Sequence, residues 1–523
     1  MIINIHMGPR TGGPGESRRR YDTLTTPSGT VATLLHVEET LGLTDIIGVD
    51  ESFPGETATK QKIGHIIEQD IAEGRRSFLL FTVLLYNAER TVHYVRELKQ
   101  KYGDKITIVV GGQMVPLAEE AYRNNADIDV VCVGDAEAIL PDLVRDMREN
   151  MALATHGLKR RYEGWVKDLA DQRFAGVSYD RFWMIRERLA TQRLISAEFG
   201  ERNPRGELGF SQLTIQGPGG PGCAWAAGNK DGACSFCALQ NITSMSKTPL
   251  RDALENEARV AKQFGADRLF DIANQFLPSL KRAEIKRWLT EYIALRGELG
   301  MTNNKYVYLT VNSVDDEIAG MLRQIGINEV YLGIDHFHPD ALASQNKPFR
   351  TSIQNGASVK ASQLDSDALE EPVSKDMLER TLSALKANSI SFRASVVVGA
   401  AHETEETLEA VRRGVREIFT RFENARSIRI SSVKIIPGSR IFAEMQESGL
   451  CADVFLNFKT LGYLTAKEQD TLNRTYVNEL SEISYDQVEA IEREVLEMSR
   501  EFGKSEYIIE DDRLAMYKTA VAE

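Results

Sequence analysis

The sequence has 523 residues but only five cysteines, and three of these, Cys223, Cys234 and Cys237, fall within fifteen positions. So few, clustered cysteines argue against a disulfide framework and favour a metal or redox site in a reducing cytoplasm. The N-terminus lacks the charged region and apolar stretch of a secretory signal, and no apolar run of about 18 residues or more predicts a membrane span. We therefore expect a cytoplasmic protein without a membrane partner.

Basic residues are fewer than acidic ones, and the formal net charge is therefore −13. This acidic balance argues against a general affinity for nucleic acid. Internal repeats and low-complexity tracts are absent. The 42% hydrophobic and 27% charged content is ordinary for a soluble globular protein. At roughly 100–200 residues per domain, the length predicts two to four domains.

The first 150 residues contain five short apolar runs rich in β-branched residues, which predict buried parallel strands. These runs are Ile2–Ile5, Asp45–Val49, Ser77–Leu84, Ile106–Val110 and Val130–Val133. Amphipathic stretches such as Ala88–Tyr102 lie between them and predict helices. This alternation predicts an α/β fold, with a doubly wound, Rossmann-like parallel sheet over residues 1–150.

Ligands of doubly wound sheets bind outside the carboxyl ends of the strands. In this sequence those positions carry Tyr86, Asn87, Gly111, Gly112, Gln113, Gly134, Asp135 and Glu137. The glycines permit the backbone to approach a ligand closely. The alternative is that they only form the tight turns that every fold of this class uses.

The rest of the chain predicts three further regions. Residues 151–206 are charged and predict a helical connector. Residues 207–450 again alternate, with six predicted strands and helices between them, which favours a full or partial parallel barrel. Residues 451–523 predict a mostly helical C-terminal region. Chemistry in such barrels sits at the carboxyl ends of the strands, and the cysteine loop follows the first of these strands, Gln212–Gln216.

The cysteine loop itself indicates a metal centre. Four glycines and two prolines precede Cys223, ten residues follow it, and the segment closes with Cys234-Ser235-Phe236-Cys237. Three thiolates can bind three irons of a cubane [4Fe–4S] cluster, which leaves the fourth iron open to a small molecule such as S-adenosylmethionine (SAM). Zinc is the alternative, since a C-x2-C pair is also a zinc half-site, but the nearest histidines, His156 and His336, are far away in the sequence.

Beyond the cysteines, the sequence resembles the radical SAM superfamily. Cys234-Ser235-Phe236-Cys237 matches the C-x-Φ-C half of the family signature, whose aromatic residue packs near the cofactor adenine. The segments that resemble the third to sixth strands of the family are Tyr308–Ser313, Ile327–Asp335, Ala394–Gly399 and Ile435–Ser439. The resemblance covers residues 207 to about 445 and implies a partial (β/α)6 radical SAM barrel with a [4Fe–4S] cluster rather than zinc.

The N-terminal domain resembles the cobalamin-binding domain of one branch of that superfamily. Ile108–Gly112 and Val131–Glu137 stand where the branch has its "vvvGG" and "vvGEGE" segments. The sequence has no D-x-H-x-x-G motif, so it offers no histidine as a lower ligand to cobalt. Cobalamin therefore either binds without such a ligand or does not bind.

The sequence also departs from the family pattern. The usual spacing is C-x3-C-x2-C, whereas the insert Ala224–Ala233 separates the first two cysteines here. The Gly-Gly-Glu turn after the second strand is replaced by Asp271–Asn274, and the fifth-strand turn reads Ala400–Glu403 instead of Leu-Pro-Gly-Glu. These differences put the details of cofactor access and SAM binding in question.

The resemblance and the strand-end rule imply a set of SAM contacts. Asp271 and Asn274 are candidates for the amino group, Asn312 or Arg393 for the carboxylate, and Asp335 for a ribose hydroxyl, with Phe236 and Val397 completing the set. The alternatives are purely structural roles: Asn312 would cap a helix, Asp335 would pair with a lysine, and Arg393 would lie on the surface. His336, His338 and His402 are candidate substrate or acid–base groups, although a lone histidine is more often structural.

Three functional hypotheses follow. The first is a cobalamin-associated radical enzyme, for example a C-methyltransferase acting on a small molecule or natural product, with an external one-electron reductant of flavodoxin or ferredoxin type. The second is a rearrangement, cyclisation or oxidation without cobalamin. The third is a non-enzymatic cluster or zinc protein. Only Cys132 and Cys451 remain outside the loop, which excludes a second cluster held entirely by cysteine.

Overall fold

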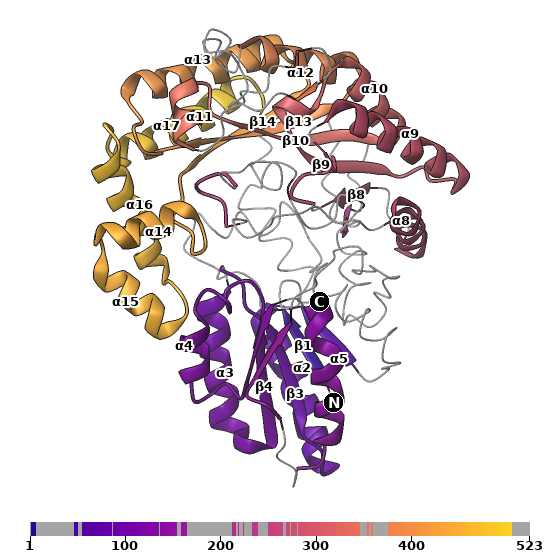
Figure 1. The fold of residues 1–523 in the computed structure, drawn as a ribbon, viewed down its shortest axis with the longest axis vertical. Coiled ribbons are helices and arrows are strands. Elements are labelled where there is room, and N and C mark those ends of the chain that lie inside the picture. Colours follow the sequence, from indigo (N-terminus) through magenta and orange to yellow (C-terminus); the bar gives the residue numbers. More distant parts are fainter. Residues whose placement is uncertain are drawn as a thin grey trace. The chain divides into compact units, whose positions relative to one another are not determined.

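The computed structural model describes residues 2–6, 46–50, 55–85, 87–134, 136–153, 158–164, 212–215, 218, 223, 233–238, 249–264, 268–271, 273–279, 281–345, 353–354, 357–358 and 375–504. The chain divides into two compact units, each built on one parallel sheet. Figure 1 labels their elements. Each unit is described by itself below.

The described strands of the first unit form a six-stranded parallel sheet in the order β2-β1-β3-β4-β5-β6. Its strands are β1 (Ile2–His6), β2 (Ile46–Asp50), β3 (Ser77–Thr82), β4 (Ile106–Gly111), β5 (Val130–Gly134) and β6 (Arg161–Gly164). Its helices are α2 (Gly55–Ala72), α3 (Ala88–Tyr102), η2 (Gly103–Lys105), α4 (Glu119–Asn124) and α5 (Ala136–Glu149). The order 2-1-3-4-5 is flavodoxin-like, with its switch point between β1 and β3.

Helices cover both faces of this first sheet. Leu143 and other apolar residues of α5 pack with Phe78 of β3 in one buried cluster. Phe81 of the same strand meets Tyr94 of α3, with the ring centroids 6.1 Å apart. Because residues 78 and 81 of a strand point to opposite faces, α5 and α3 lie on opposite faces of the sheet. The predicted doubly wound arrangement is therefore confirmed.

One strand was missed within the predicted helical connector. Residues 161–164 form β6, which pairs with β5 in parallel register. Tyr162 is buried against the sheet, and Arg161 pairs with Glu119 at 2.5 Å. A four-residue strand with one inward side chain carries too little apolar pattern to be recognised in a charged segment. The remainder of the connector, 165–206, lies outside the described residues.

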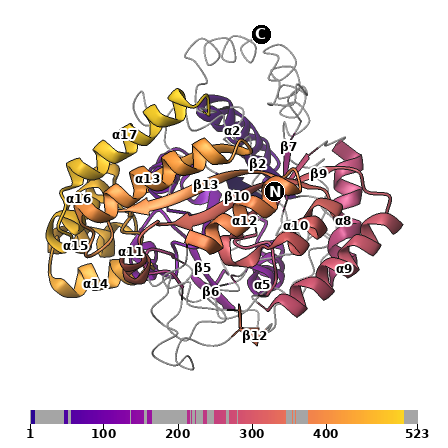
Figure 2. The same cartoon turned by 90° about the horizontal axis from the view of Figure 1, so that it is seen from above.

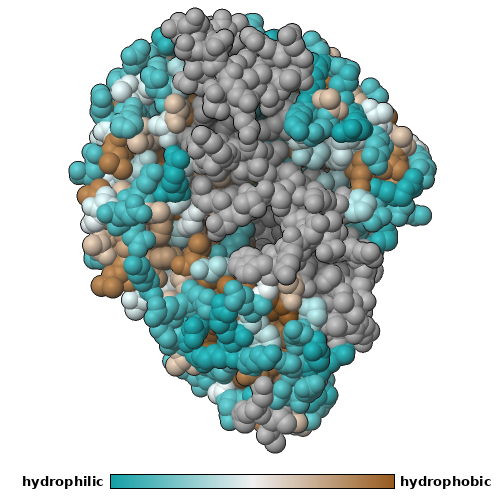
Figure 3. All heavy atoms as spheres, in the orientation of Figure 1, coloured by the Kyte–Doolittle hydropathy of each residue, from teal (hydrophilic) through white to brown (hydrophobic). Residues whose placement is uncertain are grey.

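Helix α15 (Ala452–Leu461) belongs to the first unit although it comes late in the sequence. Its following residue, Gly462, accepts a hydrogen bond at 2.6 Å from the Tyr122 hydroxyl of α4. Leu456 and Leu461 of α15 are exposed by 65% and 40%. Figure 3 shows hydrophobic surface over this helix, on a face that is otherwise largely hydrophilic where residues are described.

The second unit contains another six-stranded sheet of described strands, in the order β14-β13-β10-β9-β8-β7. Its strands are β7 (Gln212–Ile215), β8 (Arg268–Asp271), β9 (Asn304–Thr310), β10 (Ile327–Asp335), β13 (Ser391–Val398) and β14 (Ala425–Ser432). The pairings from β8 to β14 are all parallel. A short antiparallel pair, β11 (Ile353–Gln354) and β12 (Ala357–Ser358), lies apart from this sheet.

Helices alternate with these strands, as predicted for residues 207–450. They are α8 (Leu250–Phe264), α9 (Arg282–Glu298), η5 (Val311–Ser313), α10 (Asp316–Gln324), α11 (Pro339–Ser344), α12 (Lys375–Ala387), α13 (Glu405–Arg421) and α14 (Arg440–Ser448). Figures 1 and 2 show α9, α10, α12 and α13 on one side of the sheet. Thr404 and Thr407 form a capping box that begins α13.

The C-terminal part of this unit is helical, with α16 (Ala466–Leu480) and α17 (Tyr485–Glu501). Glu492 of α17 accepts a hydrogen bond at 2.7 Å from the backbone N–H of Ser432, which anchors the helix to β14. The predicted α/β class, with two parallel sheets and a helical C-terminal region, is confirmed. Among the described helices, none is both long and apolar enough to span a membrane.

Candidate active site

The two faces of the second sheet differ in burial. Along β10, Val330, Leu332 and Ile334 are fully buried, whereas the alternating Tyr331 and Gly333 are only half-buried. Side chains alternate along a strand, so the second set marks the face away from the helices. We call this the inner face. Its half-buried residues on the three central strands include Tyr308, Thr310, Tyr331, Gly333, Ser395 and Val397.

A buried carboxylate closes the amino end of the inner face. Glu329 is 1% exposed and accepts hydrogen bonds from Arg268 at 2.7 Å and from Arg393 at 2.6 Å. The Arg426 guanidinium lies 3.6 Å away. Burial alone would raise the pKa of Glu329, but the three guanidinium groups lower that pKa to about 2. This cluster of opposite charges links β8, β10, β13 and β14.

The same cluster changes the interpretation of Arg393. The sequence placed it among the contacts of the SAM carboxylate, or else on the surface. In the structure it is the third residue of β13, close to the amino end of the strand, and its partner is Glu329. A guanidinium held at the amino end of the sheet does not reach a binding site at the carboxyl end. The structure therefore favours neither interpretation.

The cysteine loop is fastened at the opposite, carboxyl end. The backbone N–H of Ser235 donates to the carbonyl of Gln345 at 3.0 Å, and the N–H of Ile441 donates to the carbonyl of Ser235 at 3.2 Å. The buried Gln345 amide in turn donates to the carbonyl of Val397, near the end of β13, at 3.0 Å. Cys234–Cys237 is thus held between the segments that follow β10 and β14.

The three thiols of the cysteine loop are accessible to a cofactor. Cys223, Cys234 and Cys237 are each half-buried, so a cofactor can reach them. Within the described part of the chain, no three His, Cys, Asp or Glu groups converge as ligands of one metal ion. A cubane binds each thiolate through a different iron, so its ligands need not surround a single point, as they would for zinc. Residues 224–232 of the insert lie outside the described residues.

The two remaining cysteines belong to the first unit. Cys132 lies in β5, where burial raises the pKa of its thiol to about 12. Such a thiol is a poor source of thiolate. Cys451 begins α15 with a left-handed backbone, at φ 56°. Neither shares a unit with the cysteine loop.

Backbone strain marks the carboxyl end of β10. Asp335, the last residue of this strand, has φ 62° and is 5% exposed. The register between β10 and β13 shifts at the same place, between Gly333 and Asp335. A non-glycine residue in the left-handed region costs on the order of 1 kcal/mol, and such strain gathers at functional sites. Asp335 is the predicted ribose ligand, and this observation makes it a good candidate.

Asn312 is free of the capping role that the sequence left open for it. The N-cap of α10 is Asp315, whose carboxylate accepts a hydrogen bond from the N–H of Ile318 at 2.9 Å. Asn312 lies in η5, just after β9, and its amide oxygen accepts a hydrogen bond from the Thr310 hydroxyl at 2.7 Å. Its half-buried amide N–H group stands at the carboxyl end of the sheet, where a cofactor carboxylate would need a donor.

The turn after β8 separates its two candidate ligands. Asp271 is fully buried, and its carboxylate accepts a hydrogen bond from the N–H of Ala273 at 2.9 Å, which shapes the turn. Asn274 is exposed. Of the two predicted contacts of the SAM amino group, Asn274 is therefore the accessible one.

His336 is committed to the fold. It is 3% exposed, and its Nδ1 accepts a hydrogen bond from the N–H of His338 at 2.9 Å. Its Nε2 lies 2.8 Å from a carboxylate oxygen of Glu403, which is fully buried. Glu403 also accepts a hydrogen bond from the N–H of Gly399. This pair joins the segments that follow β10 and β13.

The other two predicted substrate histidines differ from His336. His338 caps α11, because its Nδ1 accepts a hydrogen bond from the N–H of Asp340 at 3.3 Å. His402 is exposed and has a left-handed backbone, at φ 65°. Its N–H donates to the carbonyl of Leu480 at 2.9 Å. The imidazole of His402 is thus the most accessible of the three.

The strand ends of the first sheet are shaped largely by their own packing. Asn87 is fully buried, and its amide accepts a hydrogen bond from the N–H of Leu84 and donates one to the carbonyl of Thr82. Gly112 has φ 105°, and a Cβ there would lie 2.7 Å from the carbonyl oxygen of Val83. Glycine is therefore required at this position whether or not a ligand binds.

The remaining residues of this edge are partly accessible where the structure describes them. Gly111 and Gly134 are half-buried, and Gln113 is exposed. Tyr86 and Asp135 lie outside the described residues. Glu137 falls in the first turn of α5, but its side chain is also outside the description.

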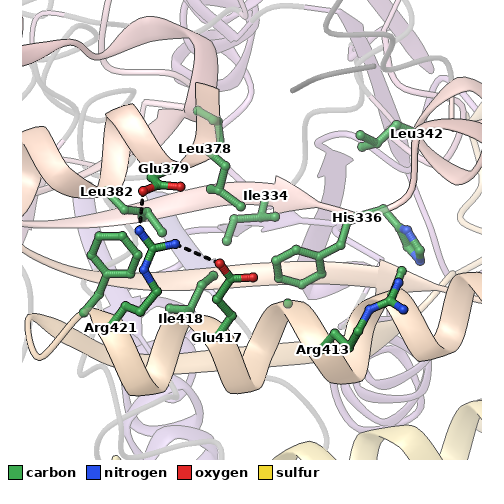
Figure 4. A pocket seen from close by; sticks show the side chains of 15 residues that line it. Ile334, His336, Leu342, Leu378, Glu379, Leu382, Arg413, Glu417, Ile418 and Arg421 are labelled. Atoms are coloured by element: carbon green, nitrogen blue, oxygen red, sulfur yellow. Dashed lines mark hydrogen bonds and ion pairs between the residues drawn. The ribbon is translucent and has the colours of Figure 1, made fainter. Parts of the chain in front are cut away.

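A cavity of about 360 Å³ lies on the helix-covered side of β10. Its walls are mostly apolar and include Ile334, Phe337 and Leu382. Figure 4 shows Arg421 between Glu379 and Glu417, with which it forms ion pairs. Since Ile334 and Asp335 point to opposite faces of the strand, this cavity is separate from the inner face.

Sequence reasoning missed four residues that build the site. Glu329, Gln345 and Glu403 are buried polar groups that fasten strands or loops, and Gln275 is buried beside Cys223. Glu329 carried a usable signal, because a charged residue in an apolar strand implies a buried partner. The other three lie in turns, where nothing local distinguishes a buried amide or carboxylate from an exposed one.

The fold of the chain is that of radical SAM enzymes that bind cobalamin. A structure of the radical SAM methyltransferase TsrM from Kitasatospora setae, with tryptophan substrate and a SAM analogue bound, matches at a TM-score of 0.58 and 16% identity. The match covers 86% of this chain and 76% of TsrM. Another TsrM structure contains cobalamin and a [4Fe–4S] cluster, and matches at a TM-score of 0.56 and 15% identity, over 86% of this chain and 78% of that one.

The cobalamin-dependent SAM radical enzyme OxsB, with aqua-cobalamin and SAM bound, also matches at a TM-score of 0.58. The identity is 11%, and the match covers 91% of this chain but 65% of OxsB. No protein-family model matches the sequence, and no curated protein is significantly similar to it. At these identities the likeness establishes a shared fold, and it leaves activity to be argued from the site.

Proposed function

We propose that this chain is a radical SAM enzyme. The observation that carries the proposal is the cysteine loop at the carboxyl edge of a parallel sheet, on a fold shared with TsrM and OxsB. Cys223, Cys234 and Cys237 would hold the [4Fe–4S] cluster and leave one iron open for SAM. When bound, this pair of cofactors supplies one-electron cleavage of SAM and a radical able to abstract hydrogen from an unactivated C–H bond.

The described residues suggest how SAM is held. Asn274 and Asn312, which follow β8 and β9, would bind its amino and carboxylate groups, and Asp335, the last residue of β10, a ribose hydroxyl. Phe236, within the cysteine loop, and Val397, on the inner face, would pack against the adenine. Asp271 and Arg393 are not included, because each is committed to a structural partner.

We further propose that the first unit binds cobalamin at the carboxyl edge of its sheet, and that the reaction is methyl transfer to a small molecule. The flavodoxin-like strand order and the cobalamin named in the TsrM and OxsB structures support this. Gly111, Gln113 and Gly134 would line the site with Tyr86, Asp135 and Glu137. Cobalt would then lack a lower histidine ligand from the usual motif. An external flavodoxin or ferredoxin would supply electrons.

A second function without cobalamin has its own support. Asn87 and Gly112 are fully explained by packing, so the two most conspicuous residues of the edge do not require a ligand. In that case the same radical chemistry would end in rearrangement, cyclisation or oxidation of the substrate.

One experiment separates these possibilities. The protein is purified without oxygen, reconstituted with iron and sulfide, incubated with hydroxocobalamin and assayed with SAM and a reductant. We expect about four irons, bound cobalt, and both 5′-deoxyadenosine and S-adenosylhomocysteine. Iron and 5′-deoxyadenosine without cobalt would favour the second function. Zinc in place of iron, with no cleavage of SAM, would overturn the proposal.

A further inference from the structure

A buried glutamine amide lies against the first cluster cysteine. Gln275 is 1% exposed, and its Oε1 lies 3.9 Å from Cys223 Sγ, which donates to it. The other end of the amide, Nε2, is buried without a hydrogen-bond partner among the residues that the structure describes. A buried donor left unpaired is costly, and native structures rarely contain one without a reason.

The position of this amide is fixed by its neighbours. Gln275 follows the turn that Asp271 closes, and the N–H of the next residue, Phe276, donates to the carbonyl of Tyr308 at 3.0 Å. Phe276 is itself fully buried and packs edge-on against Trp288, with ring centroids 5.3 Å apart. The backbone therefore presents Gln275 to Cys223 from a rigid support.

The pairing between Gln275 and Cys223 must change when iron binds. A metal-bound cysteine is a thiolate, so its sulfur has lost its proton and can only accept. The amide oxygen of Gln275 would then face a negative sulfur. Because the oxygen and nitrogen of an amide are nearly the same size, rotation about the last side-chain bond exchanges them without repacking. The unpartnered Nε2 then faces the sulfur as a donor.

We propose that Gln275 donates a hydrogen bond to the Cys223 thiolate, or to a cluster sulfide beside it, and thereby tunes the reduction potential of the cluster. This inference rests on the proposed function, since it requires the cluster. Hydrogen bonds to the sulfurs stabilise the more negative, reduced state and raise the potential. Gln275 is thus a tuning residue, which touches the cofactor but takes no part in the bond changes.

The test compares two variants with a matched control. Gln275→Leu and Gln275→Met each remove the donor at nearly constant size. The control is Asn424→Leu, because the Asn424 amide donates to the carbonyl of Ile390 near the amino ends of β13 and β14, and its oxygen is also buried without a partner. Each protein is reconstituted, its iron is counted, and the cluster is titrated by EPR.

We expect both Gln275 variants to hold a full complement of iron but to show, at a fixed potential, a ratio of reduced to oxidised cluster about tenfold lower than wild type. Tenfold corresponds to about 59 mV for a one-electron couple. Asn424→Leu should leave the ratio unchanged. A wild-type ratio in fully loaded Gln275→Leu would overturn the inference while leaving the proposed function intact.

A second measurement does not depend on any variant. Wild-type protein with ¹⁵N in its glutamine amides is examined by pulsed EPR of the reduced cluster. We expect a ¹⁵N coupling, together with an exchangeable proton that is lost in D2O. A loaded cluster without either signal would reject the hydrogen bond. Failure of wild type to take up any iron–sulfur cluster would instead reject the proposed function.

Discussion

The two ends of the second sheet are built in opposite ways. At the amino end, the Glu329 carboxylate lies within ion-pair distance of three arginines, Arg268, Arg393 and Arg426. At the carboxyl end, Asp335 and His402 have left-handed backbones, and the buried amide nitrogen of Gln275 has no partner within the described parts of the chain. The charged cluster links four strands at the amino end, and the carboxyl end carries the segments that hold the cysteine loop.

A second buried ion pair stabilises the helix layer of the same unit. Lys305 of β9 and Glu257 of α8 are essentially unexposed and form an ion pair. The Tyr292 hydroxyl of α9 also donates to Glu257, at 3.4 Å. Breaking such a pair is costly because one charge is left buried and alone. Both ion pairs therefore stabilise the framework on which the site is built.

The largest effect should come from the thiols, because they are the least dispensable groups at the carboxyl end. We expect Cys234→Ala to abolish SAM cleavage and to lower iron content, with the fold retained. Cys451→Ala, in the first unit, is the matched control and should keep both. Iron counting, circular dichroism and the 5′-deoxyadenosine assay measure these outcomes. Substantial cleavage by a Cys234→Ala protein would refute the assignment of this cysteine.

At the amino end the expected effect is on stability rather than on chemistry. Glu329→Gln would leave three guanidinium groups without their carboxylate, and breaking a buried ion pair costs about 3–5 kcal/mol. We expect denaturant unfolding to show a loss of that size. The protein that remains folded should still load the cluster. A loss below about 1 kcal/mol would show that the arginines find other partners.

The same carboxylate should produce a pH dependence that separates the two ends. The folded pKa of Glu329 is about 2, below its ordinary value of 4.5. Its contribution to stability is therefore fully present above about pH 5 and is lost as the pH falls towards 2, a change of ~3 kcal/mol. The stability difference between wild type and Glu329→Gln should shrink over that range. A constant difference would contradict the lowered pKa.

The sequence predicted the repeating parts of this fold well. The helix predicted at Ala88–Tyr102 begins and ends where α3 does, and the predicted strand Ile106–Val110 is only one residue shorter than β4. Apolar periodicity and Gly or polar boundaries are local signals, so a single sequence is enough to read them. The prediction missed β6 because a strand with a single inward-facing residue, Tyr162, shows too little apolar alternation to be recognised.

Positions within the site were harder to predict, because they depend on contacts between distant segments. Arg393 looks like an anion-binding arginine until its partner Glu329, 64 residues earlier, is placed beside it. Asn312 looks like a helix cap, but Asp315 takes that role three residues later. Gln275 carries no local sign that Cys223 will lie against it. The three thiols were recognisable because their chemistry depends mainly on residue type and spacing.

The smallest expected effect concerns the strained residue itself. Asn tolerates the left-handed region as well as Asp does, so Asp335→Asn should keep the backbone and change stability by less than about 1 kcal/mol. If the carboxylate accepts a hydrogen bond from a ribose hydroxyl, the KM for SAM should rise about 10-fold, while kcat changes less, since a bond to a charged group contributes about 1.5–3 kcal/mol and the amide retains part of it. Ser395→Ala, also on the inner face, serves as a control for polarity alone. If KM is unchanged while the protein becomes markedly less stable, the strain at Asp335 serves the fold and not SAM binding. The part of the sheet that only supports the fold would then extend to the last residue of β10.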